Sequence, residues 1–217
     1  MMHDHRFITR RRLLLAAGGV AGMAAAPLHA TEGLSMATVD RAYRSALGRA
    51  GAVVLVRHAV TVPGIGDPPN FRVEDCATQR NLSEEGRAQA RRLGQWFRER
   101  GLVPMRVRSS QWCRCLDTAG QAFGKDNFGQ TVTVEPWPAL NSFFQGHGHR
   151  ERQLQEAVQS ARQFAQRAQS GEFEVWVTHQ VTVSSLTQHA LGMGEMIVAR
   201  HEGPGNGLRV LASGLRF

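Results

Sequence analysis

The feature that most limits the possible folds is the alternation of short apolar runs with amphipathic segments. The runs have the length and the branched apolar residues of buried strands, whereas the longer segments repeat apolar residues at helical spacing. Strands that alternate with helices indicate a largely parallel sheet with helices on both faces, and therefore an α/β fold. We expect strands at 52–56, 105–107, 131–134, 173–177, 196–200 and 208–211, and helices at 37–49, between Ser83 and Gly101, and at 112–123, 151–169 and 181–191.

Length and charge narrow the class of protein further. The 217 residues fit one full-sized domain better than two. A formal net charge of +8 favours anionic ligands. Nucleic acid is not expected as a partner, because the chain has a single lysine, Lys125, and no clustered Lys/Arg runs with interleaved aromatic residues.

The first thirty residues are typical of a targeting segment. Three consecutive arginines, Arg10 to Arg12, precede an apolar stretch through Ala26 that is too short and too rich in Ala and Gly for a membrane span. We expect residues 1–30 to be a twin-arginine-type export signal removed after about Ala30, and residues 31–217 to be the folded domain. The alternative is an uncleaved N-terminal anchor. Export predicts a periplasmic or secreted protein with no stable membrane insertion after cleavage.

The three cysteines suggest one disulfide and one free thiol in such an oxidising compartment. Cys113 and Cys115 are too close along the chain to pair comfortably, so we expect Cys76 to bond one of them. Three free thiols are the alternative. The spacing does not resemble a metal site, and no metal or other cofactor is expected.

Three predicted strands lead to residues with related chemistry. The first ends at Arg57-His58, the second leads to Ser110 and Arg114, and a later one ends at Thr178-His179. Because the carboxyl ends of parallel strands lie along one edge of a sheet, we expect these side chains to converge there.

Two arginines and two histidines in one pocket suit phosphoryl transfer. Guanidinium groups match phosphate oxygens in bidentate fashion. An imidazole can attack phosphorus to form a covalent intermediate. The arginines and a second, protonated histidine would offset charge that develops on the phosphoryl oxygens without a metal ion.

Four segments between residues 53 and 180 carry these candidates in order. They are Arg57-His58-Ala59-Val60-Thr61, residues 80–86 (RNLSEEG), residues 110–119 (SQWCRCLDTA) and Val177-Thr178-His179-Gln180. Together they resemble the motifs of the histidine phosphatase superfamily, which includes the cofactor-dependent phosphoglycerate mutases. The resemblance implies a three-layer α/β/α sandwich with a mostly parallel central sheet.

The resemblance also implies a role for each matching residue. His58 would be the nucleophile that becomes phosphorylated. The other implied roles are the phosphate pocket for Arg57, Arg114 and His179, and the pocket wall for Thr61, Thr78 and Arg80.

Three positions depart from the family pattern. Ala59 and Gln180 replace glycines that follow the two histidines, and Gln180 adds a side chain at the pocket mouth. Ser142 stands where many members carry a glutamate general acid, which typically contributes a factor of about 10² to 10⁴. Either another carboxylate serves, or the substrate has a better leaving group, as in phosphohistidine phosphatases of the superfamily. The candidate acids are Glu135, Asp75, Asp67 and Glu195.

The long predicted loop from Thr61 to Asn81 has two interpretations. It forms part of the pocket entrance, with Phe71 and Arg72 near the substrate, or it is a rigid loop packed on the sheet edge. Phe143-Phe144 likewise either line the pocket or belong to the core.

The predicted function is a phosphatase that hydrolyses phosphate monoesters or related phosphoryl compounds through a phosphohistidine on His58. The partner is a small phosphorylated substrate or phosphate. The alternatives are a phosphoglycerate mutase-like phosphotransferase and a non-catalytic periplasmic anion-binding protein. Neither the natural substrate nor the oligomeric state follows from the sequence.

Overall fold

The computed structural model describes residues 35–124, 128, 132–205 and 207–217. The predicted export signal at residues 1–30 lies outside the described residues. Within them, no helix combines the length and the apolar character needed to cross a membrane.

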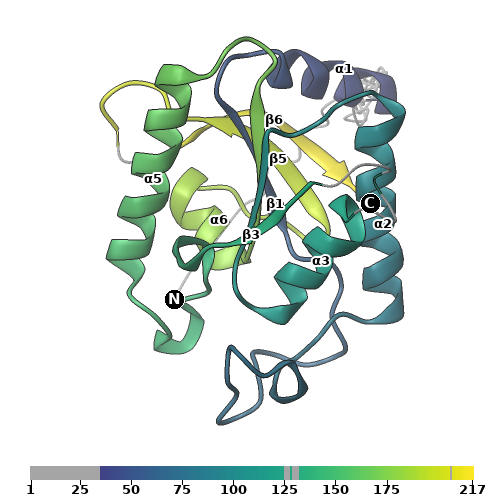
Figure 1. Ribbon diagram of the computed structural model, residues 1–217, viewed down its shortest axis with the longest axis vertical. Helices are drawn as coiled ribbons and strands as arrows, with labels where there is room; N and C mark the ends of the chain where they lie inside the picture. The colour runs from purple at the N-terminus through teal and green to yellow at the C-terminus, as the bar shows by residue number, and fades with distance from the viewer. Residues whose placement is uncertain (1–34, 125–127, 129–131, 206) are drawn as a thin grey trace, which may run out of the picture. The chain divides into compact units, whose positions relative to one another are not determined.

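A six-stranded sheet in the order β3-β2-β4-β1-β5-β6 forms the centre of the fold (Figure 1). Neighbouring strands among β3, β2, β4 and β1 pair in parallel, and β5 and β6 extend the sheet with antiparallel pairing. The predicted α/β fold with a mostly parallel sheet is therefore confirmed. The strands are β1 (Ala52–Arg57), β2 (Arg106–Ser109), β3 (Val134–Pro136), β4 (Phe173–Thr178), β5 (Glu195–Arg200) and β6 (Arg209–Arg216).

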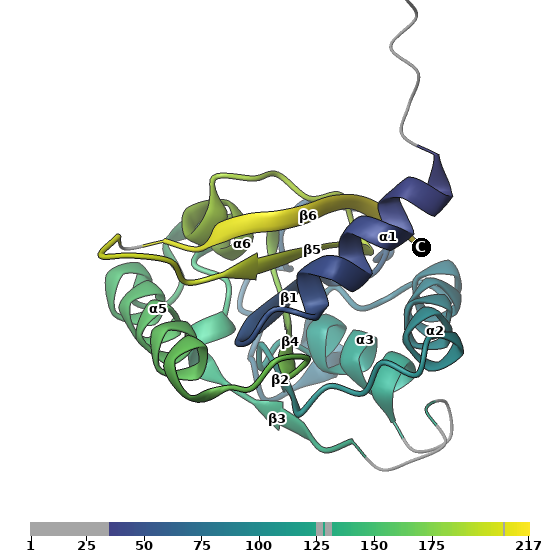
Figure 2. The ribbon, with the colours of Figure 1, turned by 90° about the horizontal axis from the view of Figure 1, so that it is seen from above.

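Five α-helices of the described residues cover the two faces of the sheet, as expected for three layers (Figure 2). Alternate residues of β1 point to opposite faces: Val54 and Val56 pack with the first group of helices, Val53 and Leu55 with the second. The first group is α1 (Met36–Leu47), α2 (Glu84–Glu99) and α3 (Cys113–Phe123), and the second is α5 (Arg150–Arg167) and α6 (Gln180–Thr187).

Helix α2 has the ends that its sequence predicts. The hydroxyl of Ser83 accepts a hydrogen bond from the amide of Gly86 at 3.1 Å, as in an N-cap. Gly101, with φ of +62°, follows the last turn in the left-handed conformation that favours glycine. Gly86 has a second role, because a Cβ at this position would overlap the main-chain carbonyl of Val60. Helix α2 therefore begins in direct contact with the chain that leaves β1.

Three elements differ clearly from the prediction. The last strand, expected at 208–211, runs from Arg209 to Arg216 as β6. The strand expected at 131–134 is the short edge strand β3 at Val134–Pro136. The helix expected at 181–191 ends at Thr187, because Gln188 takes a left-handed conformation with φ of 61°. The chain from there to Gly194 instead passes the end of β1, where the amide of Gly194 donates to the carbonyl of His58 at 3.1 Å.

Candidate active site

The predicted strand ends do converge. Arg57 and Thr178 are register partners in the parallel pair β1 and β4, so the residues that follow them are neighbours. The amide of His58 donates to the carbonyl of Thr178 at 2.9 Å. The ring centroids of His58 and His179 are 5.5 Å apart, with an interplanar angle of 65°.

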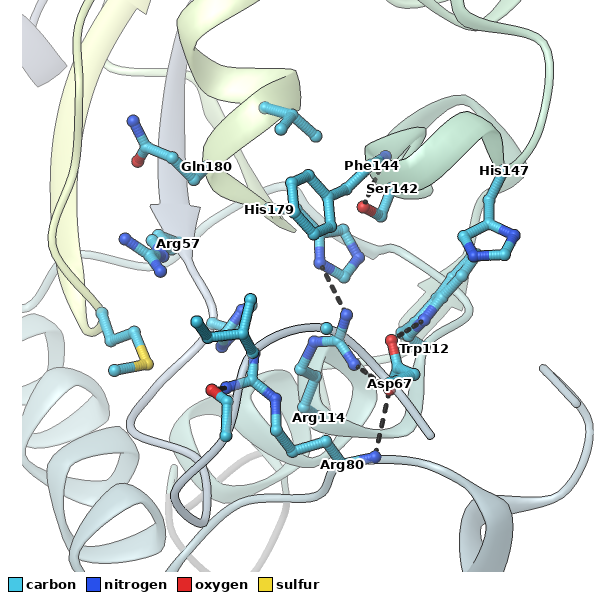
Figure 3. Close-up of a pocket in the computed structure, with 16 residues that line it drawn as sticks. Arg57, Asp67, Arg80, Trp112, Arg114, Ser142, Phe144, His147, His179 and Gln180 are labelled. Atoms are coloured by element: carbon cyan, nitrogen blue, oxygen red, sulfur yellow. Dashed lines mark hydrogen bonds and ion pairs between the residues drawn. The ribbon is translucent and has the colours of Figure 1, made fainter. Parts of the chain in front are cut away.

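A cavity of about 360 Å³ opens over this pair (Figure 3). Four of the predicted site residues, His58, Arg57, Arg114 and His179, line it together with Arg80 and Asp67. Other lining residues come from the loop after β1, the segment near Ser142 and the start of α6: Gly64, Ile65, Gly66, Trp112, Ser142, Phe144, His147, Gln180, Val181 and Met193.

His58 is held in the form that a nucleophile needs. Its Nδ1 lies 2.9 Å from the carbonyl of Ala59, and because a carbonyl only accepts, Nδ1 carries the proton. Nε2 is then the nitrogen with the free lone pair. Burial, reinforced by the positive charge of Arg114, lowers the pKa of His58 to about 3. The ring is therefore neutral at physiological pH.

His179 is held as the opposite tautomer. Asn141 Oδ1 accepts from the amide of Gln111 at 2.8 Å and from the hydroxyl of Ser110 at 3.1 Å. Ser110 has thus used its proton and accepts from Nε2 of His179 at 2.8 Å, which leaves Nδ1 to accept from Arg114 Nη2 at 3.5 Å. Burial and the charge of Arg114 put the pKa of His179 well below its ordinary value. The expectation of a protonated second histidine is therefore wrong for this form of the pocket.

The three guanidinium groups have hydrogen-bonding capacity to spare. Arg57 donates through Nη1 to the carbonyl of Leu191 at 2.7 Å, and Arg80 donates to the carbonyl of Gly64. The Nε atoms of Arg57, Arg80 and Arg114 are buried without a hydrogen-bond partner. Burial and the neighbouring cations lower the pKa of Arg57 and of Arg80. Cations packed against one another in this way create a strong preference for an anion.

Asp67 is the carboxylate that lines the cavity, and three donors hold it. Arg114 Nη1 and the amide of Arg80 contact Oδ1 at 2.7 and 3.0 Å, and Trp112 Nε1 contacts Oδ2 at 3.1 Å. Burial raises the pKa of Asp67, but these hydrogen bonds and the charge of Arg114 outweigh it, so the net pKa is lowered. Asp67 is therefore ionised and unsuited to donate a proton.

The other candidate acids lie outside the cavity lining. Glu135 faces Arg106 and Arg108 at the edge of the sheet. Asp75 pairs with Arg72 within its own loop, and the carboxylate of Glu195 accepts from the amide of Gly192.

Thr61 and Thr78 also lie outside the lining, unlike Arg80. Thr61 is buried in a bridge with Leu82, whereas Thr78 bonds the main chain of Arg72 and Asp75. Of the predicted pocket wall, the structure thus brings only Arg80 to the cavity.

The expected disulfide is confirmed, and it joins Cys76 to Cys113. The bond links the turn η1 (Cys76–Thr78) to the first residue of α3, the helix that carries Arg114. Cys115 is the remaining buried free thiol, and burial raises its pKa to about 12. Cys115 is buried and lies outside the cavity lining, as is typical of an unreactive structural thiol.

Several lining residues were absent from the sequence interpretation. Trp112 lies inside the third motif, between Ser110 and Arg114. A large aromatic residue two positions before a predicted pocket arginine is a signal that could have identified it as a lining residue. Ile65, Val181 and Met193 carry no sequence signal, because only the fold brings their segments together. Phe144 lines the cavity, whereas Phe143 packs under the guanidinium of Arg150, 5.6 Å from its ring centroid.

Comparisons with known structures agree with this architecture. A mycobacterial glucosyl-3-phosphoglycerate phosphatase has a similar fold, with a TM-score of 0.54, 16% identity, and 76% of this chain and 99% of that chain covered. The protein histidine phosphatase SixA, complexed with tungstate, gives a TM-score of 0.50 and 13% identity, with 73% of this chain and 93% of that chain covered. YhfR of Bacillus stearothermophilus gives a TM-score of 0.50 and 18% identity, with 74% of this chain and 95% of that chain covered. No curated protein matches the sequence.

The sequence also matches a family model. Residues 53–146 match the histidine phosphatase superfamily (branch 1), a segment that contains the first three of the four motifs. The match supports a phosphatase or mutase-like function. The resemblance of this chain to the histidine phosphatase superfamily is thereby confirmed.

Proposed function

We propose that this chain is a phosphatase that transfers a phosphoryl group from a small phosphorylated substrate to His58 and then to water, without a metal ion. One observation carries the proposal: His58 is a neutral, buried imidazole with Nδ1 bonded to the carbonyl of Ala59 and Nε2 free, in a cavity lined by three guanidinium groups.

In the first step, the Nε2 lone pair of His58 attacks phosphorus. An N–P bond forms, the P–O bond to the leaving group breaks, and its electron pair departs on the leaving oxygen. Water then attacks phosphorus, the N–P bond breaks, and the electron pair returns to Nε2. Both protons of the water remain on the released dihydrogen phosphate, so His58 returns to its starting form.

The cationic residues stabilise the charge on the transferred group. Arg57, Arg80 and Arg114 bring three positive charges, and Asp67 compensates one of them. Their donors act on the phosphoryl oxygens in the way that metal ions do elsewhere. His179 neighbours the same group as a neutral ring that holds Arg114 through Nδ1.

We also propose that the protein works after export, in the periplasm or outside the cell. The arginine-rich start of the sequence and the Cys76–Cys113 bond support this location, because disulfides persist in oxidising compartments. A mutase is disfavoured there, since it would need a phosphorylated cofactor that such a compartment does not supply.

The test is hydrolysis of 4-nitrophenyl phosphate by the full chain and by two variants, with chelator present throughout. His58→Ala removes the nucleophile and is expected to abolish turnover. His149→Ala is the matched control, because this exposed histidine does not line the cavity. Phosphate binding without turnover by the full chain would overturn the proposal in favour of an anion-binding protein.

A further inference from the structure

The part of the cavity lining that the structure describes has no carboxylic acid positioned to donate a proton. Among the described residues, Asp67 is the carboxylate in the lining, and three donors hold it as an anion. His179 directs its proton to Ser110, away from the cavity, and accepts from Arg114 at its other nitrogen. An alkyl ester, which leaves as a strongly basic alkoxide, would therefore depart without assistance.

The same lining also carries several apolar side chains. Phe144 and Ile65 line the cavity with exposed fractions of 44% and 90%, so both side chains are available to a ligand. Val181, Met193 and the ring of Trp112 complete this surface, which we call the apolar wall: Ile65, Trp112, Phe144, Val181 and Met193. In Figure 3, Phe144 lies across the cavity from Arg80.

Two polar side chains of the lining have part of their hydrogen-bonding capacity in use within the protein. Gln180 donates through Nε2 to Ser184 at 2.9 Å and accepts through Oε1 from the amide of Leu191 at 2.8 Å. Ser142 accepts from the amide of Phe144 at 3.2 Å. Hydroxyl groups of a sugar that face the apolar wall would be desolvated without partners there, which is costly.

We propose that the site is selective for phenolic phosphates, in which the leaving oxygen is attached to an aromatic ring. This inference rests on the proposed phosphatase function and specifies its substrate class. A phenol has a pKa of about 10, so its oxygen takes the electron pair of the broken P–O bond as phenolate and needs no proton in that step. The ring packs on the apolar wall, where the half-exposed Phe144 offers aromatic contact.

The first test compares phenyl phosphate with cyclohexyl phosphate, which has nearly the same size but leaves as an alkoxide. We expect kcat/KM for phenyl phosphate to exceed that for cyclohexyl phosphate by at least about 10²-fold, the lower end of what a general acid supplies. Equal values within about threefold would overturn the inference.

The second test asks whether the apolar wall recognises the ring. Acetyl phosphate also leaves without a proton but has no ring, so the ratio of kcat/KM for phenyl phosphate to that for acetyl phosphate isolates ring binding. Phe144→Ala should lower this ratio about fivefold, as expected for one aromatic contact. Phe143→Ala is the matched control, because Phe143 packs on Arg150 outside the cavity and should leave the ratio unchanged.

A third test concerns His147, which also lines the cavity and is the alternative candidate for a general acid. If His147→Gln slows cyclohexyl phosphate far more than phenyl phosphate, His147 is a general acid and the inference is overturned. The phosphatase function would survive that result. If neither ester is hydrolysed and His58→Ala changes nothing, the proposed function itself fails, so the two failures are distinguishable.

Discussion

The two sides of the cavity are held in place by different interactions. On the strand side, His58 and His179 follow adjacent parallel strands, and main-chain pairing of Arg57 with Thr178 sets their separation. On the loop side, Asp67 and Arg80 belong to the segment between β1 and α2, which side-chain hydrogen bonds and a disulfide hold. The strand side is therefore expected to keep its geometry when one side chain is replaced, whereas the loop side depends on individual bonds.

Replacement of Arg114 should have the largest effect, because this residue contacts Asp67 on the loop side and His179 on the strand side and so joins the two sides. Arg114→Ala removes a buried guanidinium from the phosphoryl group, so we expect kcat/KM for 4-nitrophenyl phosphate to fall about 10³-fold. Arg87→Ala, on α2 beside Glu84 and Asp117, is the control and should be close to wild type. A loss of less than tenfold for Arg114→Ala would exclude a direct role.

Removal of the disulfide tests how far the loop side depends on it. The double change Cys76→Ser and Cys113→Ser opens a loop of sequence separation 37 and should lower the free energy of unfolding by about 4 kcal/mol in urea titrations. The loop residues would also be less constrained, so KM should rise more than kcat falls. The wild-type protein in reductant should behave in the same way. A dominant fall in kcat would mean that the strand side also depends on the bond.

The two histidines make a pH-dependent contribution to stability on the strand side. Both have pKa values below the ordinary 6.5, so below that pH the unfolded chain binds protons that the folded chain does not. The unfolded state then gains free energy, and stability falls as pH falls. From pH 7.5 to 5.5 we expect a loss on the order of 1 kcal/mol from His58 and a further loss in the same direction from His179, measured by urea unfolding. His58→Gln should remove one of these two contributions, and an unchanged dependence would contradict it.

Asp67→Asn should have the smallest effect of these changes, and it tests the charge of the loop side alone. The change keeps the shape of the side chain but removes the negative charge of Asp67 from the cavity lining, so phosphate should bind about fivefold more tightly in calorimetry. Asp75→Asn, in the same loop but outside the lining, is the control. Weaker binding by Asp67→Asn would instead mean that Asp67 orients Arg114 for the anion.

The strand side could be predicted from sequence because its geometry follows from backbone pairing. A run such as Val53 to Val56 must be buried, and once the sheet is parallel, the residues after β1 and β4 are neighbours whatever else the chain does. The cap at Ser83 is equally local, since hydroxyl and amide are three residues apart. The antiparallel edge of β5 and β6 was not predicted, because apolar runs carry no signal for strand direction.

The loop side could not be predicted in the same way. Asp67 was a candidate acid, yet its ionised state depends on Trp112, Arg114 and the amide of Arg80, which approach it only in the fold. The neutral state of His179 likewise depends on burial, which the sequence does not encode at one position. The sequence also left open whether Cys113 or Cys115 bonds Cys76. The fold decides this, because Cys113 faces the loop that carries Cys76 whereas the sulfur of Cys115 is buried in the core.

The contact between Gly86 and Val60 sets a limit on how this site can change. A methyl group at position 86 would collide with main chain two residues after the nucleophile, so α2 could move only by dragging that segment with it. The distance between helix and nucleophile is thus limited by this close approach and held by hydrogen bonds, because the amide of Val60 donates to Gln89 Oε1 at 3.0 Å and the amide of Ser83 donates to the carbonyl of Val60 at 3.0 Å. In a saturation library at this position, glycine should be the one residue recovered, and new substrate preference would have to arise on the opposite, apolar wall.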